Sequence, residues 1–311
     1  MTIERVKEKY SAPINTIEIG SPAFRTVKVG GQTGLPFLFD EGQMPNPPLI
    51  AYEVLDCPPD DWPEHLVEPY KDVIKDPVKW ARKCVDHFGA QALCVRLQSI
   101  HPDYGSRPAE EALTTLKAIH NRTRVPLIVV GSGDDELDND IMPKVSQAMK
   151  GENCLLGIAT QSNYKTLAAT CLADGHSIIA DSPIDINIAK QVNILISDMG
   201  FDPKKIVMHP TTTSLGYGME YVYSIMERGR LAAFMGDKML SMPFIVFIGA
   251  EVWRTKEAKD FGKTQGVNWE LTTAISMLQA GADILVMRHP EAADSAKRFI
   301  DSIIPKAVNR G

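Results

Sequence analysis

The sequence predicts a single (β/α)8 barrel, and three observations support this fold. From Leu49 onward, short runs rich in Leu, Ile and Val alternate with longer amphipathic stretches, giving about eight strand–helix units. The runs lack polar/apolar alternation, as expected for parallel strands that are covered on both faces. The chain has no G-x-G-x-x-G turn, which favours a closed barrel over an open doubly wound sheet. We therefore expect residues 49–311 to form the barrel.

The expected strands are short and are followed by helices with ordinary start and stop signals. Pro77 stands at the start of the first long helix and Gly89 just past its end. The expected strands cover residues 49–56, 92–97, 126–131, 155–160, 177–181, 205–209, 243–249 and 283–288. The expected helices cover residues 77–87, 107–121, 136–149, 163–173, 184–199, 219–230, 269–280 and 291–304.

Residues 1–48 do not follow the alternation of strands and helices, and we therefore predict that they form an N-terminal extension. The segment TVKVGGQTGLPF, residues 26–37, resembles a β-hairpin with Gly30 and Gly31 at its turn. We expect this hairpin to cover the N-terminal end of the barrel, where an apolar floor would otherwise meet water. The chain is thus interpreted as one domain with an extension.

Charge and hydropathy exclude several classes of partner. The net charge is −6 and the sequence pI about 5.7, without a block of Lys or Arg, so neither nucleic acid nor an anionic membrane surface is expected as a partner. The N-terminus has no apolar signal region, and the most apolar stretch, residues 239–252, is interrupted by Ser241, Pro243 and Gly249. These features predict a soluble, cytoplasmic protein.

The cysteines argue against a metal or disulfide framework in this chain. There are 5 of them, an odd number, and none forms a C-x-x-C pair. Each is expected to be a small buried hydrophobe. An iron–sulfur centre, if one is needed, is therefore expected on a partner.

Functional groups of a barrel come from the ends of its strands and the loops that follow them. We expect the rim to carry Glu53, Asp56, Arg96, Gln98, Ser99, residues 131–133, residues 161–163, Asp181, Ser182, Asp185, Asn187, residues 209–217, Glu251, Arg288 and His289.

The densest of these segments is HPTTTSLGYGMEY, residues 209–221. The hydroxyls of Thr211, Thr212 and Thr213 can both donate and accept hydrogen bonds. Gly216 lets a ligand approach the backbone closely, and Tyr217 offers a flat amphipathic ring. The combination favours a large planar ligand rich in amides. In the competing interpretation, the threonines cap the next helix and the glycines form its turn.

The segment SPIDIN, residues 182–187, is the second candidate. Asp185 and Asn187 can accept from and donate to a heterocycle. The same residues also fit a capped helix start, with Ser182 at the N-cap and Pro183 at the first helical position.

Other motifs give no catalytic residue and no metal ligand. GSGDDE, residues 131–136, lacks the G-x-x-x-x-G-K-[ST] pattern, and its acidic pair would repel phosphate. His209, His289 and Glu251 share the predicted rim but not a metal-binding spacing. There is also no G-x-S-x-G nucleophile motif.

Three segments carry a resemblance to a known family. HPTTTSLGYGMEY, SPIDINIAKQVN and FLFDEGQMPNPPLIAYEVLD are similar to the small subunit of the corrinoid iron–sulfur protein, the acetyl-CoA decarbonylase/synthase delta subunit family. The resemblance covers essentially the whole chain. It implies a barrel that pairs with a large subunit as a heterodimer, with cobalamin held between that subunit and the strand-end face, and a [4Fe–4S] cluster on the partner.

The resemblance also implies a function in the anaerobic reductive acetyl-CoA (Wood–Ljungdahl) pathway of carbon fixation. A methyltransferase passes the methyl group of methyltetrahydrofolate to the corrinoid, which delivers it to acetyl-CoA synthase. The chain would then position and shield the corrinoid without independent turnover. By the resemblance, Thr211, Thr212, Thr213 and Tyr217 face the corrinoid.

Two enzymatic interpretations compete with this one. A pterin-dependent methyltransferase barrel would bind methyltetrahydrofolate itself and grip the pterin with Asp185 and Asn187; it shares the fold, but residues 1–48 are extra to it. An aldolase-like barrel needs a Schiff-base lysine at a strand end, and no expected strand ends in lysine.

Overall fold

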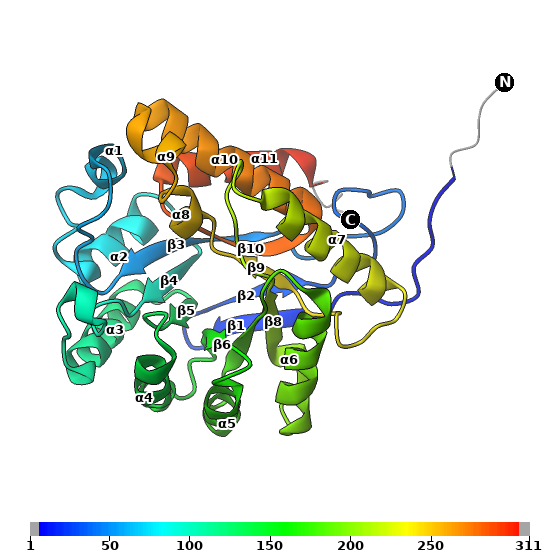
Figure 1. Cartoon of the computed structure of the whole chain (residues 1–311), viewed down its shortest axis with the longest axis horizontal. Coiled ribbons are helices and arrows are strands. Elements are labelled where there is room, and N and C mark those ends of the chain that lie inside the picture. The colour runs from blue at the N-terminus through cyan, green and yellow to red at the C-terminus, as the bar shows by residue number, and fades with distance from the viewer. Residues whose placement is uncertain (1–5, 305–311) are drawn as a thin grey trace.

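The computed structural model describes residues 6–304, and it confirms the predicted (β/α)8 barrel (Figure 1). Eight parallel strands close in the order β10-β3-β4-β5-β6-β7-β8-β9. The strands are β3 (Leu49–Leu55), β4 (Ala92–Arg96), β5 (Leu127–Val130), β6 (Leu155–Ala159), β7 (Ser177–Asp181), β8 (Ile206–His209), β9 (Phe244–Val246) and β10 (Ala282–Met287).

Helices surround the barrel and cover the outer face of the sheet (Figure 1). They are α1 (Glu64–Val67), α2 (Pro77–Asp86), α3 (Ala109–Thr123), α4 (Asp135–Ala148), α5 (Tyr164–Asp174), α6 (Ile186–Asp198), α7 (Met219–Phe234), α8 (Ile248–Val252), α9 (Lys256–Asp260), α10 (Gly262–Ala280) and α11 (Pro290–Ile303). Three 3-10 turns join them: η1 (Glu68–Tyr70), η2 (Pro102–Tyr104) and η3 (Pro203–Lys205).

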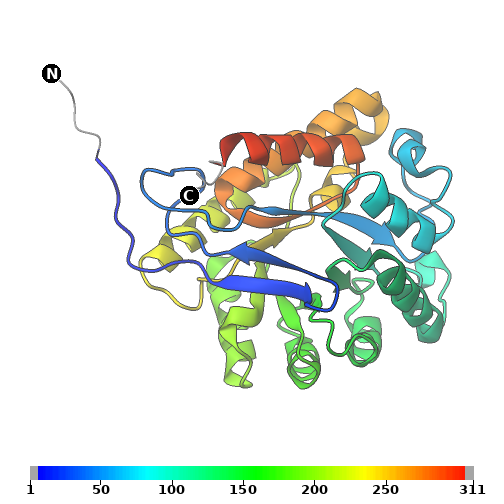
Figure 2. The same cartoon turned by 180° about the vertical axis from the view of Figure 1, so that it is seen from behind.

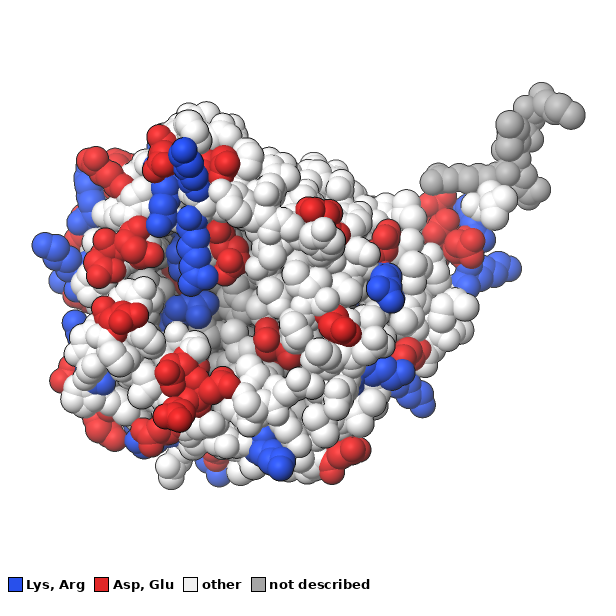
Figure 3. Space-filling model, viewed as in Figure 1, with Lys and Arg blue, Asp and Glu red and all other residues white. Residues whose placement is uncertain are grey.

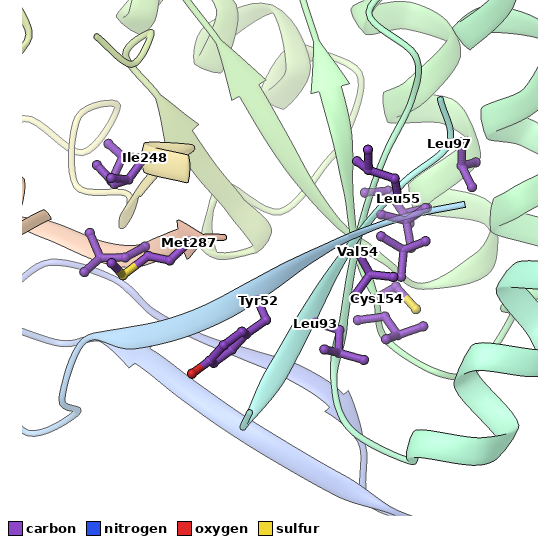
Figure 4. Close-up of a cluster of buried hydrophobic side chains, with 14 of the residues drawn as sticks. Tyr52, Val54, Leu55, Leu93, Leu97, Cys154, Ile248 and Met287 are labelled. Atoms are coloured by element: carbon purple, nitrogen blue, oxygen red, sulfur yellow. The ribbon is translucent and has the colours of Figure 1, made fainter. Parts of the chain in front are cut away.

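Alternation along each strand divides the core into two layers. On β3, Leu49 and Ala51 belong to the cluster inside the barrel, whereas Tyr52 and Val54 pack outward against the helices. Figure 4 shows these outward side chains beside Leu93 of β4. Each fully buried aliphatic side chain contributes about 1.5–3 kcal/mol. Both faces of the strands are therefore mainly apolar, which explains the hydrophobic runs in the sequence.

Two predicted boundaries near the seventh strand are wrong. The expected strand over residues 243–249 ends at Val246, because the chain turns into α8 at Ile248. Helix α10 begins at Gly262 instead of residue 269, and Val267 and Gly266 on its first turns are buried. Short helices are hard to separate from apolar strands by pattern alone.

The N-terminal hairpin exists, but the predicted position of its turn is wrong. Strand β1 (Thr16–Ser21) pairs antiparallel with β2 (Arg25–Gly30), and Ser21 faces Arg25 across the turn. Gly30 and Gly31 lie at the opposite end, both with positive φ, where the chain bends away. A Cβ on Gly30 would lie 2.1 Å from the carbonyl oxygen of Asn15, so this bend requires glycine.

The hairpin lies across the N-terminal end of the barrel, as seen from behind in Figure 2. Ile17, Ile19 and Val29 are buried in the same cluster as the inward side chains of the barrel strands. The backbone N–H of Asn15 donates to the carbonyl of Ser241 at 2.7 Å, in the loop that leads into β9. The other end of the barrel is left open to ligands.

Candidate functional site

A cavity of about 230 Å³ opens at the C-terminal ends of the strands. Its walls come from β4, β6 and β8 and from the segments after β3, β5, β9 and β10. The lining includes Trp62, Arg96, His209, Thr212, Phe247 and Arg288. The structure thus brings together rim residues from seven different strand ends, as the barrel predicts.

A buried ion triad lies at the base of this cavity. The carboxylate of Glu53 on β3 accepts from Nε of Arg96 on β4 at 2.7 Å and from Nε of Arg288, after β10, at 2.5 Å. Glu53 is 1% exposed. Burial alone would raise the pKa of this carboxyl, but the guanidiniums of Arg288 and Arg96 hold it at about 2. The three side chains meet because β3 is hydrogen-bonded between β10 and β4.

Gly249 in α8 makes room for Arg288. A Cβ at position 249 would lie 2.6 Å from Cγ and 2.7 Å from the backbone nitrogen of Arg288. Any larger residue would therefore push this arginine out of the triad. The Arg288 guanidinium carbon also lies 4.8 Å from the centre of the Trp62 ring, and that of Arg96 lies 5.6 Å from the centre of the Phe247 ring.

His209 is held between a carboxylate and a hydroxyl. Its Nδ1 lies 2.5 Å from the carboxylate of Asp181 and its Nε2 lies 2.9 Å from Oγ1 of Thr212. Because a carboxylate only accepts hydrogen bonds, Nδ1 carries the proton that faces Asp181. Thr212 Oγ1 also accepts the backbone N–H of Phe247 at 2.9 Å. The Thr212 hydroxyl therefore links His209 of β8 to the segment after β9 through two hydrogen bonds.

The neighbouring Thr213 differs from Thr212 in the hydrogen bonding of its hydroxyl. Its Oγ1 is buried and has no hydrogen-bond partner among residues 6–304. It lines a second hollow of about 140 Å³, which shares Glu251 and Arg254 with the first. A buried hydroxyl without a partner costs free energy unless a ligand or solvent satisfies it.

The two threonines give a matched stability prediction. Thr212→Val should lower the free energy of unfolding by about 1–3 kcal/mol, because it leaves the buried N–H of Phe247 unsatisfied. Thr213→Val should leave it unchanged or raise it slightly, because the lost hydroxyl has no internal partner. Chemical denaturation followed by circular dichroism measures both. Equal losses in the two variants would contradict the bonding described here.

The other residues predicted in this segment lie at the rim. Thr211 lines the larger cavity, has φ +64° and donates its hydroxyl to the carbonyl of Ser182 at 2.7 Å. Gly216, with φ +78°, forms the turn before α7. Tyr217 is 51% exposed, and its hydroxyl donates to the carboxylate of Glu257 at 2.9 Å.

Asp185 and Asn187 are not brought into this group. The Asp185 carboxylate caps α6 and accepts the backbone N–H of Asn187 at 2.7 Å and of Ile188 at 3.2 Å. Asn187 is exposed on the first turn of α6. As far as the described residues go, neither lines either hollow. A capped helix start is present, but its predicted position is wrong: the N-cap is Asp185 and α6 begins at Ile186, not at Pro183 after Ser182.

The loop after β5 and the rim histidine His289 are both engaged in contacts within the protein. The backbone N–H groups of Ser132 and Gly133 point to the carboxylate of Asp138 on α4, at 2.7 and 3.1 Å, so this loop is occupied by a side chain of its own protein. His289 caps α11 and accepts the N–H of Glu291. In the described part of the chain, no group of three or more His, Cys, Asp or Glu residues could hold a metal ion.

The cysteines are all buried and unpaired. Burial raises the pKa of Cys57 to about 11 and that of Cys171 to about 12, so both thiols stay protonated near neutral pH. Within residues 6–304, none of the helices has the length and apolar character needed to span a membrane.

Sequence reasoning missed two supporting carboxylates, because both lie inside helices. Asp138 on α4 orders the loop after β5, and Glu270 on α10 accepts the N–H groups of Arg288, His289 and the Trp253 indole. Burial raises the pKa of Glu270 to about 7, against the effect of these donors. A charged residue on the inward face of an amphipathic helix was the available signal in both cases.

Comparison with known proteins places the chain in a family. Residues 16–296 match the family model described as CO dehydrogenase/acetyl-CoA synthase delta subunit. The acetyl-CoA decarbonylase/synthase complex subunit delta of Methanocaldococcus jannaschii is 31% identical over 310 residues, which cover 96% of this chain and 76% of that protein. The subunit delta of Methanopyrus kandleri is 36% identical over 280 residues, covering 88% of this chain and 69% of that protein.

Among solved structures, dihydropteroate synthase from Thermus thermophilus has a TM-score of 0.56 at 15% sequence identity, covering 86% of this chain and 99% of that one. A likeness at this identity concerns the barrel fold alone. The family match and the two relatives confirm the resemblance seen in the sequence segments. The chain belongs to the CO dehydrogenase/acetyl-CoA synthase delta subunit family.

Proposed function

We propose that this chain is the small subunit of a corrinoid iron–sulfur protein and that its strand-end face shields a cobalamin held by the large subunit. The observation that carries the proposal is the β8–α7 loop, where Thr213 has an unpartnered buried hydroxyl and Tyr217 an exposed ring. Both residues line one hollow at the open end of the barrel. Membership of the delta subunit family supports the same assignment.

The size of the hollows bears on how such a group would fit. A corrinoid macrocycle is much larger than a cavity of about 230 Å³, so it would lie across the rim and not inside the barrel. The adjoining hollows of about 230 and 140 Å³ share Glu251 and Arg254, and their linings offer hydroxyl, amide and aromatic groups. Peripheral amides suit this lining, because hydroxyls donate to and accept from them. The residues present therefore fit the group.

Thr213 and Tyr217 are the contacts we favour among the predicted residues. The hydroxyls of Thr211 and Thr212 are used internally, so these residues would shape the surface and contribute contacts through their remaining lone pairs. Gly216 would permit close approach of the backbone. Asp185 and Asn187 would contribute only at the edge of the covered area, since they lie on α6 outside the hollows.

The bound corrinoid would supply the cobalt that carries a methyl group between methyltetrahydrofolate, through a methyltransferase, and acetyl-CoA synthase. This chain would exclude water from that centre and orient its periphery. The large subunit would carry the [4Fe–4S] cluster, and the assembled heterodimer would work in the cytoplasm. Figure 3 shows mixed charges over α1, α2 and α9 and few over α7 and α10, so one border of the mouth is polar and the other largely uncharged.

Retention of cobalamin by the assembled heterodimer tests the proposal. After co-expression with the large subunit, gel filtration and visible spectra should show one corrinoid-bearing complex. Thr213→Val combined with Tyr217→Ala should reduce the corrinoid retained per complex at least several-fold, because both contacts are lost while the fold is kept. Thr114→Val, on the exposed face of α3, is the control and should retain it fully.

Full retention by the double variant would contradict the assignment of this surface. An isolated chain that demethylates methyltetrahydrofolate would instead support the pterin-dependent methyltransferase interpretation.

A further inference from the structure

Arg96 and Arg288, at the base of the cavity of about 230 Å³, have N–H donors that bind no other described residue. Arg96 and Arg288 each bind Glu53 through Nε. Their terminal amino groups have no hydrogen-bond acceptor among the described residues, and both side chains line the cavity. Arg288 is nevertheless 7% exposed, so these donors face a confined space and not open solvent.

The arrangement is rigid before any ligand arrives. The Glu53 carboxylate bridges the two guanidiniums, and the rings of Phe247 and Trp62 lie against them. Arginine side chains normally lose considerable rotamer freedom when they bind a ligand. Here the protein has already fixed them, so an anion placed between their terminal groups would gain charge-assisted hydrogen bonds at low entropic cost.

The charge balance selects the kind of anion. Arg96 and Arg288 contribute two positive charges and Glu53 one negative charge, which leaves a net charge of +1 in the triad. Arg254 at the cavity edge is already paired with Glu251 at 3.0 Å, and Asp61 adds a carboxylate to the wall. A monoanion matches the +1 of the triad itself, whereas a phosphate dianion would exceed it, and the Asp61 carboxylate would make that excess of negative charge larger.

The other residues that line the cavity indicate what the rest of the ligand, apart from its anionic group, would be. Trp62, Tyr104, Ile158, Phe247 and Ala250 supply the aromatic and apolar parts of a lining that is otherwise polar. We infer that the cavity above Glu53 is a binding site for the carboxylate of a small organic molecule with an aromatic or apolar body, held by the terminal amino groups of Arg96 and Arg288. The site does not depend on the proposed corrinoid function, because it lies below the rim and is complete in this chain.

Phenylacetate and its neutral isostere phenylacetamide test the site in the unmodified full chain. Isothermal titration calorimetry should show saturable binding of phenylacetate and at least tenfold weaker binding of phenylacetamide. Intrinsic tryptophan fluorescence should change with the same saturation curve, because Trp62 lines the cavity and Arg288 lies against its ring. Inorganic phosphate should bind more weakly than phenylacetate at a pH where it is a dianion.

Arg288→Lys and Arg96→Lys keep the positive charge that Glu53 needs but remove the forked donors. Each should weaken phenylacetate binding at least tenfold, while the control Arg82→Lys, on the exposed surface of α2, should not. Equal affinities for phenylacetate and phenylacetamide, absence of binding, or stronger binding of phosphate would each overturn the inference. The comparison of phenylacetate, phenylacetamide and phosphate uses the unmodified chain, so it tests the inferred site even if a substituted chain fails to fold.

Discussion

Glu53→Gln should lower the free energy of unfolding by about 3–5 kcal/mol at neutral pH. The substitution leaves the guanidiniums of Arg96 and Arg288 close together in a buried position without the carboxylate that neutralises them. Breaking a buried ion pair by removing one partner has a cost of this order, because desolvation of the remaining charge is no longer compensated. Equilibrium denaturation in urea, followed by circular dichroism, measures the loss.

Glu251→Gln is the matched control. Glu251 also pairs with an arginine, at 3.0 Å, but Arg254 is largely exposed and the pair is screened by solvent. Exposed pairs contribute about 0–1 kcal/mol, so the control should be close to the unmodified protein. If Glu53→Gln and Glu251→Gln lowered the free energy of unfolding equally, the buried triad would contribute no more to stability than a surface ion pair.

The same triad predicts how stability changes with pH. Its two arginines lower the folded-state pKa of Glu53 from the ordinary value of 4.5 to about 2, so the folded protein binds fewer protons there than the unfolded chain. The resulting stabilisation is fully present above about pH 4.5 and disappears as the pH falls through about 2. The stability gap between the unmodified protein and Glu53→Gln should therefore narrow over this range. A gap that stays constant on acidification would show that charge is not its cause.

The barrel could be predicted from the sequence because burial on both faces leaves a strong signal. Strands such as β5 (Leu127–Val130) are apolar throughout, and the helices between them begin and end with ordinary capping residues. The hairpin turn was harder to predict. Glycine pairs favour turns, yet Gly30 and Gly31 serve a bend after β2, and the alternation of Ile17 and Ile19 was the better signal for β1.

The rim of the site could also be predicted, but not what each group does there. Glu53, Arg96 and Arg288 all follow from strand ends, whereas their meeting requires the closure that places β10 beside β3. The three consecutive threonines look alike in sequence. Their backbone directions differ, with Thr211 at positive φ. One hydroxyl therefore donates to Ser182, the next is hydrogen-bonded to His209, and the third has no partner among residues 6–304.

Ile17→Ala and Ile19→Ala should each destabilise the protein by about 2–5 kcal/mol, although both residues lie outside the barrel sequence. The two side chains are buried against the inward residues of the barrel strands, so each truncation leaves a cavity at the floor. The combined variant should lose most of the folding free energy of a protein with ordinary stability, about 5–15 kcal/mol. Because the two sites are neighbours, the double loss need not equal the sum.

Glu18→Ala, between these two residues, separates packing from strand pairing. Its side chain points away from the floor and forms an exposed ion pair with Lys28 at 3.3 Å, so its removal should cost about 0–1 kcal/mol. Urea denaturation monitored by circular dichroism and by tryptophan fluorescence should give coincident transitions for all variants, because the hairpin and the barrel share one apolar cluster. Transitions that separate, with the barrel as stable as before, would mean that the hairpin is an independent attachment and that the barrel closes its own floor.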